Sequence, residues 1–324
     1  MGIKIENISS QLLYTFGVTS DLHIGEKQIY VDHFKTAIKA LKDKGAEFIT
    51  IAGDISRKGQ GSNELTDYSN NDNNCDGRDK DLDILMESVT NSGVNIPLYM
   101  CGGNHDVAQK NSKWNTTVNE LGRNKLNPKN IEICEYNEKT YSALINNDLF
   151  MFISFDRAFG DDTYIESIPW AIQKLNENSN KRVFMFIHYP LLDGVAGEFK
   201  NEYFGFSKNA KSNIKLINAI NEHENVIVFS GHTHHPYELA DIDERNDNVN
   251  FYLLNNNKNC ALMLAGVTSY SINDTTAIEP WVISPDYAPE GSIVKVYDNK
   301  VVIIPMNLGQ RKTLGKEYIV YSKI

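Results

Sequence analysis

Long apolar runs are absent from this sequence. The longest are short stretches such as Val183–Ile187, whereas a helix that crosses a bilayer needs about 18 or more apolar residues. The first ten residues, MGIKIENISS, also lack the basic start and apolar segment of a secretory signal peptide. We therefore expect neither a membrane span nor a signal peptide.

Cysteine is scarce and scattered. The four cysteines are Cys75, Cys101, Cys134 and Cys260, and no two of them have the C-x-x-C spacing of a zinc site. Their separations along the chain suggest no disulfide framework either. We expect free thiols in a reducing compartment, which favours a cytoplasmic location.

An excess of basic residues is also missing. Lys and Arg total 32 against 42 Asp and Glu, which gives a formal charge of −10. This balance disfavours nucleic acid as a partner, because proteins that bind it mainly through phosphate need clustered positive charge. It is compatible with a small phosphorylated substrate, because a bound metal ion can reverse the local field.

The remaining composition is that of a globular protein. The chain has 324 residues, of which 41% are hydrophobic and 23% charged, enough for one large domain or two ordinary ones. One stretch, Gly59–Asp81, is polar and rich in Asn and Asp. We interpret it as a solvated loop inserted between two elements.

Helical and strand patterns alternate early in the chain. Apolar residues at three- and four-residue spacing predict a helix over Tyr30–Leu41, between strand-like runs at Leu12–Val18 and Ala46–Ala52. This order indicates two parallel strands with a right-handed crossover. Further strands are expected at Ile96–Cys101, Tyr141–Ile145, Leu149–Phe155, Val183–Ile187, Val226–Phe229, Phe251–Leu254, Ala261–Leu264, Ile293–Tyr297 and Val301–Pro305, and further helices at Leu82–Val89, Trp170–Leu175 and Ile214–Ile220. The pattern favours a layered α/β fold with two sheets.

Metal-binding residue types follow five of the predicted strands. Asp, Asn or His stands after each of them, and five of the eight histidines lie at these positions. In open α/β sheets, ligand sites form at the carboxyl ends of strands. The candidate donors are Asp21, His23, Asp54, Asn104, His188, His232 and His234.

The number and spacing of these donors favour two metal ions. Imidazole and carboxylate suit Zn, Fe and Mn. Asp21 and His23 are two residues apart, as are His232 and His234, so each pair shares one face of an extended backbone. One ion takes about four to six donors. Seven donors therefore suit two ions that share a carboxylate.

Taken together, these segments resemble the signature of the calcineurin-like metallophosphoesterases. In chain order they are Asp21-Leu22-His23, Gly53-Asp54, Gly103-Asn104-His105-Asp106, His188 and Gly231-His232-Thr233-His234. The resemblance implies a four-layer α-β-β-α sandwich with two mixed sheets. We expect a single metallophosphoesterase domain over residues 1–324, with the core motifs within 12–240. The β-rich C-terminal segment, 250–324, either completes the second sheet, which we favour, or forms a small cap.

The resemblance further implies a role for each residue of the signature. Asp21, His23 and His234 are expected to bind the first metal. Asn104, His188 and His232 are expected to bind the second, and Asp54 is expected to bridge the two. His105 is expected to face the scissile phosphate instead of binding metal. The cofactors implied are two divalent ions of Mn, Fe or Zn.

The expected function is hydrolysis of a phosphate ester. Two divalent ions outweigh the charges of Asp21 and Asp54, so a phosphate is drawn to this one site of an acidic protein. We expect a metal-bridging hydroxide to attack phosphorus, with Asp54 and His105 as the catalytic residues and His105 as the general acid. A small phosphodiester is favoured as the substrate, because the compact GDISRKG and GNHD motifs are closest to that branch.

One segment departs from the family pattern. Several relatives carry an acid and an arginine after the GD motif, in the form GD-x-x-D-R-G, whereas this chain reads GDISRKG from Gly53 to Gly59. The difference argues against the protein-phosphatase branch. Arg57 in this segment either contacts the substrate phosphate or belongs to a solvated basic loop.

A second candidate substrate contact lies in the segment Leu191–Phe206. Its aromatic residues include Tyr203 and Phe204. The segment is either a lid that packs on the leaving group or a loop that packs on the core.

Two other functions stay open. One is a phosphomonoesterase or nucleotidase of the same family. The other is a non-catalytic scaffold on the same fold, which is disfavoured because all eight signature positions are present. Outside the signature, we expect His33 and His223 on helix surfaces, and we consider His235 a candidate supporting residue beside a ligand.

Overall fold

In the computed structural model of the protein, the residues described are 10–56, 76–106, 113–156, 164–191, 211–237, 251–253, 260–269, 271–272, 283–284 and 289–322. No helix among them is long and apolar enough to cross a membrane. Cys101, Cys134 and Cys260 are buried free thiols, and Cys75 lies outside the described residues.

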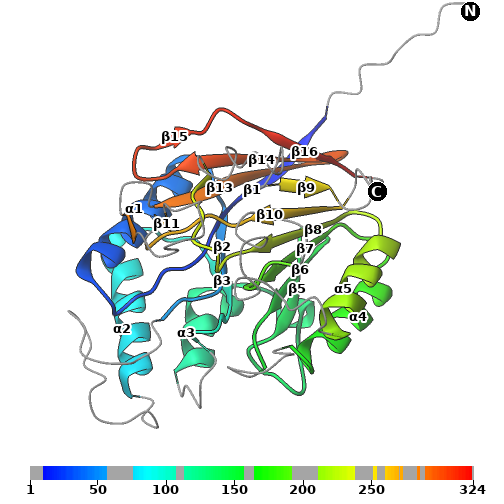
Figure 1. The fold of residues 1–324 in the computed structure, drawn as a ribbon, viewed down its shortest axis with the longest axis horizontal. Coiled ribbons are helices and arrows are strands. Elements are labelled where there is room, and N and C mark those ends of the chain that lie inside the picture. Colours follow the sequence, from blue (N-terminus) through cyan, green and yellow to red (C-terminus); the bar gives the residue numbers. More distant parts are fainter. Residues whose placement is uncertain are drawn as a thin grey trace, which may run out of the picture.

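The first sheet is built from both ends of the chain (Figure 1). Its strands run in the order β15-β14-β13-β1-β2-β3, and β16 pairs with β14. Strands β1 and β2 are parallel, as are β2 and β3, while β13 lies antiparallel against β1. The strands are β1 Leu12–Thr19, β2 Phe48–Ala52, β3 Leu98–Cys101, β13 Glu290–Tyr297, β14 Lys300–Asn307, β15 Lys312–Thr313 and β16 Tyr318–Tyr321.

The second sheet comes from the middle of the chain. Its order is β4-β5-β6-β7-β8-β10-β9, and β6, β7, β8 and β10 are parallel. The strands are β4 Ile131–Ile133, β5 Tyr141–Ile145, β6 Asp148–Ile153, β7 Val183–Ile187, β8 Val226–Ser230, β9 Phe251–Leu253 and β10 Ala261–Leu264. A separate two-stranded sheet pairs β11 (Ser271–Ile272) with β12 (Ile283–Ser284).

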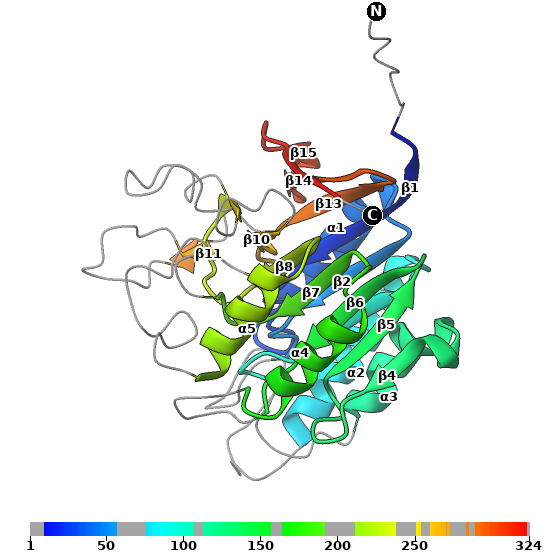
Figure 2. The same ribbon diagram turned by 90° about the vertical axis from the view of Figure 1, so that its right-hand side faces the viewer.

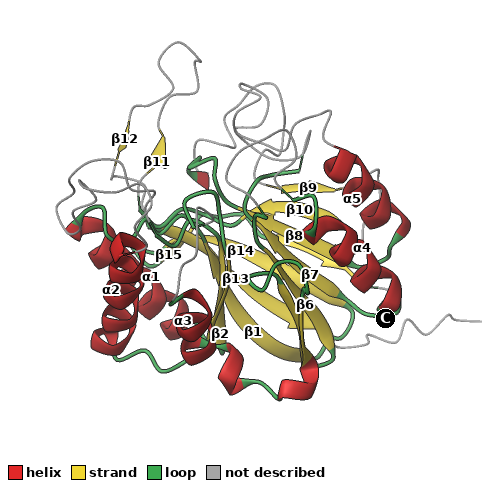
Figure 3. Cartoon of the chain, turned by 90° about the horizontal axis from the view of Figure 1, so that it is seen from below, coloured by secondary structure: helices red, strands yellow, loops and turns green. Residues whose placement is uncertain are grey.

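Helices cover the outer face of each sheet, so the predicted four-layer α-β-β-α sandwich is confirmed (Figure 3). Helices α1 (Gln28–Asp43), α2 (Asp76–Ser92) and α3 (Trp114–Leu121) lie outside the first sheet. Helices α4 (Ser167–Glu177) and α5 (Lys211–Glu222) lie side by side outside the second (Figure 2). The apolar face predicted for the first helix is the buried face of α1.

Aromatic side chains fill the space between the sheets. Phe16 of β1 meets Phe150 of β6 and Phe184 of β7 edge-on, at centroid distances of 5.4 and 5.1 Å. All three rings are fully buried. Edge-to-face contacts add to the hydrophobic gain from burial, so this layer fixes the two sheets face to face and their strand ends side by side.

The C-terminal segment is divided between the two sheets. Strands β9 and β10 belong to the second sheet, but β13, β14, β15 and β16 belong to the first. The expectation that the whole segment completes the second sheet is therefore wrong for its last part. The reason is that β1 needs a second neighbour, and the long apolar strand β13 supplies it along almost its full length.

The predicted polar insert ends earlier than expected. Most of Gly59–Asp81 lies outside the described residues, but its final residues belong to α2, which begins at Asp76. The short helix α3 was not predicted. It spans eight residues, too few for a clear periodic pattern.

A buried ion pair joins the two sheets at the end opposite the strand ends discussed below. Arg182 donates from Nε and Nη2 to Asp148 Oδ2 at 3.1 and 2.9 Å and from Nη1 to the carbonyl of Tyr297 at 2.8 Å. The hydroxyl of Tyr14 donates to the same carboxylate. These contacts connect β1 and β13 of the first sheet with β6 of the second.

Arg182→Ala should lower the free energy of unfolding by about 3–5 kcal/mol, because it leaves the Asp148 carboxylate buried without its cation. Urea denaturation followed by circular dichroism measures the change. Lys181→Ala is the control, since Lys181 makes an exposed hydrogen bond to Asn147 and should cost less than about 0.5 kcal/mol. Equal losses in the two variants would contradict the role given to the buried pair.

Candidate metal centre

The predicted donors converge where the carboxyl ends of the two sets of parallel strands meet. The loops after β1 and β2 are joined by the Asp21 N–H, which donates to the Gly53 carbonyl at 3.0 Å. The loops after β7 and β8 are joined by the Gly231 N–H, which donates to the His188 carbonyl at 3.0 Å. Parallel pairing within each sheet thus brings segments far apart in sequence to one edge.

The donors sit on unusual backbone. Five of the seven predicted donors have positive φ angles, between 48° and 70°: Asp21, His23, Asp54, His232 and His234. Left-handed backbone costs a non-glycine residue about 1–2 kcal/mol. Such strain gathers at functional sites, where it directs side chains inward. Here the five strained residues lie in the loops after β1, β2 and β8, whose side chains meet at one centre.

The structure brings six of the donors into two groups, each able to hold a metal ion. The ligand atoms within each group lie within 4.8 Å of one another. The first group is Asp21, His23 and His234, and the second is Asp54, His188 and His232. These are the sets that the resemblance implies, with Asp54 placed in the second group.

Asp54 lies between the two groups. Its Oδ2 is 3.1 Å from His188 Nε2 of the second group and 3.8 Å from His23 Nε2 of the first. Its Oδ1 accepts a hydrogen bond from the His105 backbone N–H at 2.9 Å. Since Oδ1 is held in this way, Oδ2 is the oxygen that faces both groups.

Asp21 is held in a similar manner in the first group. Its Oδ1 is 3.2 Å from His234 Nε2, while its Oδ2 accepts hydrogen bonds from the His232 N–H at 3.0 Å and from Ser20 Oγ at 2.5 Å. The Nε2 atoms of His23 and His234 lie 3.2 Å apart. One carboxylate oxygen and two imidazole nitrogens therefore point at one position, which is the arrangement of a cation's ligands.

Asn104 completes the fit. Its Oδ1 is buried and has no hydrogen-bond partner among the described residues. A buried amide oxygen rarely stays unpaired in a native structure. The preceding residue, Gly103, lies directly against Asp54 and His188, which places the backbone of Asn104 next to the second group. The donor set therefore fits two divalent cations.

Two histidines of the centre, His188 and His23, have pKa values shifted in opposite directions. His188 Nδ1 lies 2.8 Å from the Ala52 carbonyl, so this nitrogen carries the proton and Nε2 faces the site. Burial opposes a charge on His188, but Asp54 and Asp21 raise its pKa to about 9. For His23, burial together with His105 and His234 holds the pKa well below its usual range, so this imidazole is neutral.

The two carboxylates are ionised despite their burial. Burial opposes the negative charge on Asp54, yet His105, His188 and His23 hold its pKa well below the usual range. Burial likewise opposes the charge on Asp21, and His234 and His188 lower its pKa. The site is therefore a cluster of anionic oxygens and imidazoles, ready to exchange protons for metal.

His105 is half-buried, like His232, and is more exposed than the other three histidines of the centre. Its side chain is 27% exposed, while those of His23, His188 and His234 are 2%, 0% and 6% exposed. Its Nε2 lies 3.7 Å from Asp54 Oδ2. His105 therefore reaches the centre from the solvent side, as expected of a group that faces a substrate.

Three residues around the centre were not among the predicted site residues. Ser20 holds Asp21, and the ring of Tyr189 packs against His232 with centroids 4.2 Å apart. Asp106, the last residue of the Gly103–Asp106 motif, had no predicted role, and its carboxylate is fully buried. Each stands next to a predicted donor or to His105 in sequence, and that adjacency is the one signal that could have marked it.

Three predicted substrate contacts, Arg57, Tyr203 and Phe204, lie outside the described residues. Among the other histidines, the surface position predicted for His223 is wrong, because its side chain is buried and its Nδ1 lies 2.5 Å from the Glu224 carbonyl. His33 is half-buried, with Nδ1 3.0 Å from the Ser269 carbonyl.

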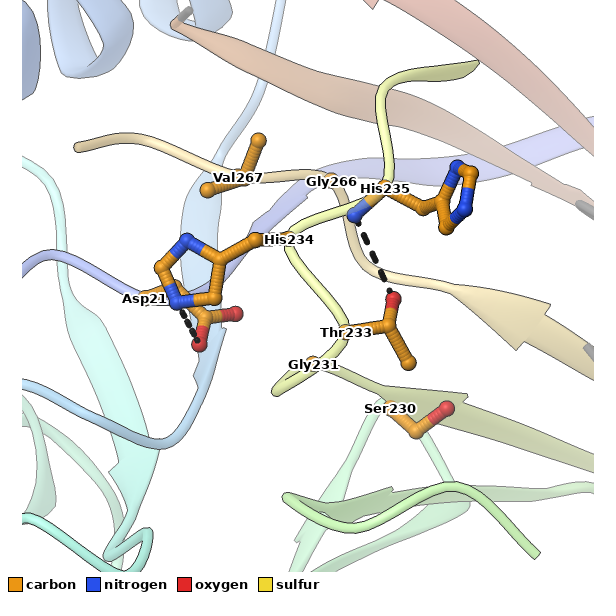
Figure 4. A pocket seen from close by; sticks show the side chains of 8 residues that line it. All are labelled: Asp21, Ser230, Gly231, Thr233, His234, His235, Gly266 and Val267. Atoms are coloured by element: carbon orange, nitrogen blue, oxygen red, sulfur yellow. Dashed lines mark hydrogen bonds and ion pairs between the residues drawn. The ribbon is translucent and has the colours of Figure 1, made fainter. Parts of the chain in front are cut away.

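A small pocket lies beside the first group (Figure 4). The His234 ring points toward Asp21, whereas the ring of His235 turns away from it. The His235 N–H donates to Thr233 Oγ1 at 3.4 Å. The pocket is lined by Asp21, Ser230, Gly231, Thr233, His234, His235, Gly266 and Val267.

Gly53→Ala should weaken metal binding by about 10–100-fold, the range seen when the support of a ligand is lost. A Cβ at Gly53 would lie 2.5 Å from His188 Nδ1 and would displace this ring. Gly45→Ala is a matched control, because Gly45 has nearly the same φ, +94° against +91°, and nothing within 4 Å of the added carbon. Titration calorimetry with Mn²⁺ measures both variants. If both bind Mn²⁺ equally well, the close packing of Gly53 on His188 is not needed for the site.

Comparison with known proteins agrees with this geometry. The family model described as calcineurin-like phosphoesterase matches residues 14–236, which include all the predicted donors. No curated protein matches the chain.

Solved structures share the fold at low identity. A dimetal phosphatase from Danio rerio has 12% identity and a TM-score of 0.58, over 97% of this chain and all of that one. A purple acid phosphatase from yellow lupin (Lupinus luteus) seeds has 11% identity and a TM-score of 0.57, over 96% of this chain and 54% of its own. GAP50, the anchor in the inner membrane complex of Plasmodium, has 10% identity and a TM-score of 0.51, over 97% of this chain and 90% of its own. At these identities the likeness concerns the fold alone.

Proposed function

Because the chain belongs to the calcineurin-like phosphoesterase family, we propose that it is a metal-dependent hydrolase of small phosphodiesters. The observation that carries the proposal is the position of Asp54 Oδ2, 3.8 Å from His23 Nε2 and 3.1 Å from His188 Nε2. One carboxylate oxygen thus faces both donor groups. This arrangement suits a pair of cations and has no evident use in a purely structural core.

In this proposal, the first ion is held by Asp21, His23 and His234, and the second by Asn104, His188 and His232, with Asp54 shared. Two bound divalent ions of Mn, Fe or Zn would supply the positive charge that attracts a phosphate and activates water as a nucleophile.

The protein's own groups supply orientation and a proton. The His105 N–H donates to Asp54 Oδ1, and the His232 N–H lies within hydrogen-bond distance of both oxygens of Asp21, so both carboxylates keep a constant direction. The half-buried His105 belongs to neither donor group, and its Nε2 lies 3.7 Å from Asp54 Oδ2. A proton held on this nitrogen can pass to the oxygen of the departing alcohol.

Two features of the sequence favour a diester over a monoester as the substrate. It is supported by the stretch from Gly53 to Gly59, which lacks the acid and the arginine spacing of the protein-phosphatase branch. A diester also carries one negative charge where a monoester carries two, and the protein as a whole is acidic.

The test is turnover by protein stripped of metal and then supplied with Mn²⁺. We expect hydrolysis of bis(p-nitrophenyl) phosphate that requires the metal, and slower hydrolysis of p-nitrophenyl phosphate. A tenfold or greater preference for the monoester would show that the protein is a phosphomonoesterase and not a diesterase. Protein that binds two metal ions and hydrolyses neither compound would favour a non-catalytic scaffold.

A further inference from the structure

The two loops that carry Asp54 and His105 are cross-linked by a second carboxylate. Asp106 Oδ2 accepts hydrogen bonds from the N–H groups of Ile55 at 3.1 Å and Gly103 at 2.8 Å. Its Oδ1 accepts from the Ser56 N–H at 2.8 Å and from Ser56 Oγ at 2.9 Å. Both oxygens are therefore fully used, and three of the four donors belong to the loop after β2.

The cross-link runs in both directions. Asp54, from the loop after β2, accepts from the backbone of His105, and Asp106, from the loop after β3, accepts from the backbone of Ile55 and Ser56. Each loop thus offers one carboxylate to the other. Lys139 Nζ donates a hydrogen bond to the backbone carbonyl of Asp106 at 2.8 Å, so the backbone of Asp106 is fixed as well.

The loops after β2 and β3 are packed so closely that there is no room for a side chain at Gly103. A Cβ at Gly103 would lie 2.3 Å from Asp54 Oδ1 and 2.8 Å from His188 Cδ2. The chain therefore passes as close to the donors as glycine allows. A small separation of the two loops would move Asp54 relative to Asn104, whose buried Oδ1 has no hydrogen-bond partner among the described residues.

From this geometry we infer that Asp106 is a positioning residue of the metal centre: by holding the loops after β2 and β3 together, it sets the place of Asp54 against Asn104 and His105. The inference rests on the proposed function for the identity of the bound group. It differs from a general role in stability because the contacts of the Asp106 side chain go to the segments that carry these residues.

Asparagine is the informative substitution at this position. An amide has one acceptor oxygen, so in either orientation its NH₂ group faces a backbone N–H, that of Ser56 or those of Ile55 and Gly103. Two donors then oppose each other, and the loops must separate. The side-chain volume stays nearly the same, so packing is not the cause of the change.

Asp156 provides a matched control. Its carboxylate also accepts from two backbone N–H groups, those of Glu166 and Ser167 at 2.7 and 2.9 Å, and from a serine hydroxyl, Ser167 Oγ. These bonds anchor the start of α4 and do not involve the loops that carry Asp54 and His105. Asp156→Asn is therefore the same chemical change away from those loops: its amide oxygen can keep both backbone bonds at Oδ2, and its NH₂ group then faces Asn137 Nδ2 and Ser167 Oγ.

The experiment compares Mn²⁺ binding by calorimetry and thermal unfolding in wild type, Asp106→Asn and Asp156→Asn. We expect Asp106→Asn to bind Mn²⁺ about 10–100-fold more weakly, while Asp156→Asn binds as wild type does. Both variants should show lowered melting temperatures. Unchanged affinity in Asp106→Asn, or an equal loss in both variants, would overturn the inference.

Ser56→Ala keeps the experiment decisive if Asp106→Asn does not fold. It removes the hydroxyl bond to Asp106 alone and should weaken Mn²⁺ binding by about fivefold, the effect of one hydrogen bond. No change in affinity would count against the inference. Wild-type protein that binds Mn²⁺ but hydrolyses no phosphate ester would contradict the proposed function, while the affinity comparison would still decide the role of Asp106.

Discussion

Asp54→Asn should lower kcat/KM for a phosphodiester by about 10³-fold or more and reduce the metal content of the protein. The amide oxygen can keep the hydrogen bond from the His105 N–H, which leaves the NH₂ group at the place of Oδ2. A neutral donor then faces His188 Nε2 and His23 Nε2, where the wild type has an anionic acceptor. Loss of shared charge at this position is worth several kcal/mol.

The measurement pairs a diester assay with elemental analysis of the dialysed protein. Asp32→Asn is the control, because it makes the same chemical change on α1 at a carboxylate that is 60% exposed. It should keep wild-type activity and metal content. If Asp54→Asn retains more than about a tenth of the activity, Asp54 is not the shared ligand.

His105→Ala should retain metal and lose turnover, by about 10²–10⁴-fold for a diester with an alkyl leaving group. Its side chain belongs to neither donor group. The backbone N–H that holds Asp54 Oδ1 is kept in the alanine variant, so the geometry of Asp54 should survive. What is lost is the imidazole that can give a proton to the departing oxygen.

The leaving group supplies the control for this variant. A p-nitrophenolate leaving group is stable as an anion and needs little protonation, so its release should suffer much less than that of an alkyl alcohol. Steady-state rates for the two substrates, measured on the same preparation, give the ratio directly. Equal losses for both substrates, or loss of metal, would show that His105 does not act as the general acid.

Much of the fold could be predicted because its signals are local. The apolar spacing of α1, the left-handed turn at Gly45 that follows it, and the β-α-β order of β1, α1 and β2 can all be recognised within one stretch of sequence. The convergence of the donors also followed from a local rule, since each stands at the carboxyl end of a parallel strand.

The remaining features depend on contacts that sequence spacing does not encode. Nothing near β13 indicates that it pairs with β1, so the C-terminal segment was assigned to the wrong sheet in part. The role of Asp106 likewise depends on which N–H groups come within reach after folding. The buried position of His223 just beyond α5 was missed because the helical pattern alone places it on a surface.

The central position of β1 ties the folding of this protein to the synthesis of β13. Phe16 of β1 pairs with Val294 of β13, so one edge of this apolar strand has no partner until about 280 further residues have been synthesised. At translation rates of about 5–20 residues per second, that wait lasts roughly 15–60 s. Throughout it, the nascent chain presents an unpaired hydrophobic edge, the kind of surface that aggregates or recruits chaperones. The candidate metal ligands Asp21 and His23, just beyond the end of the same strand, cannot be firmly placed until β13 has been synthesised.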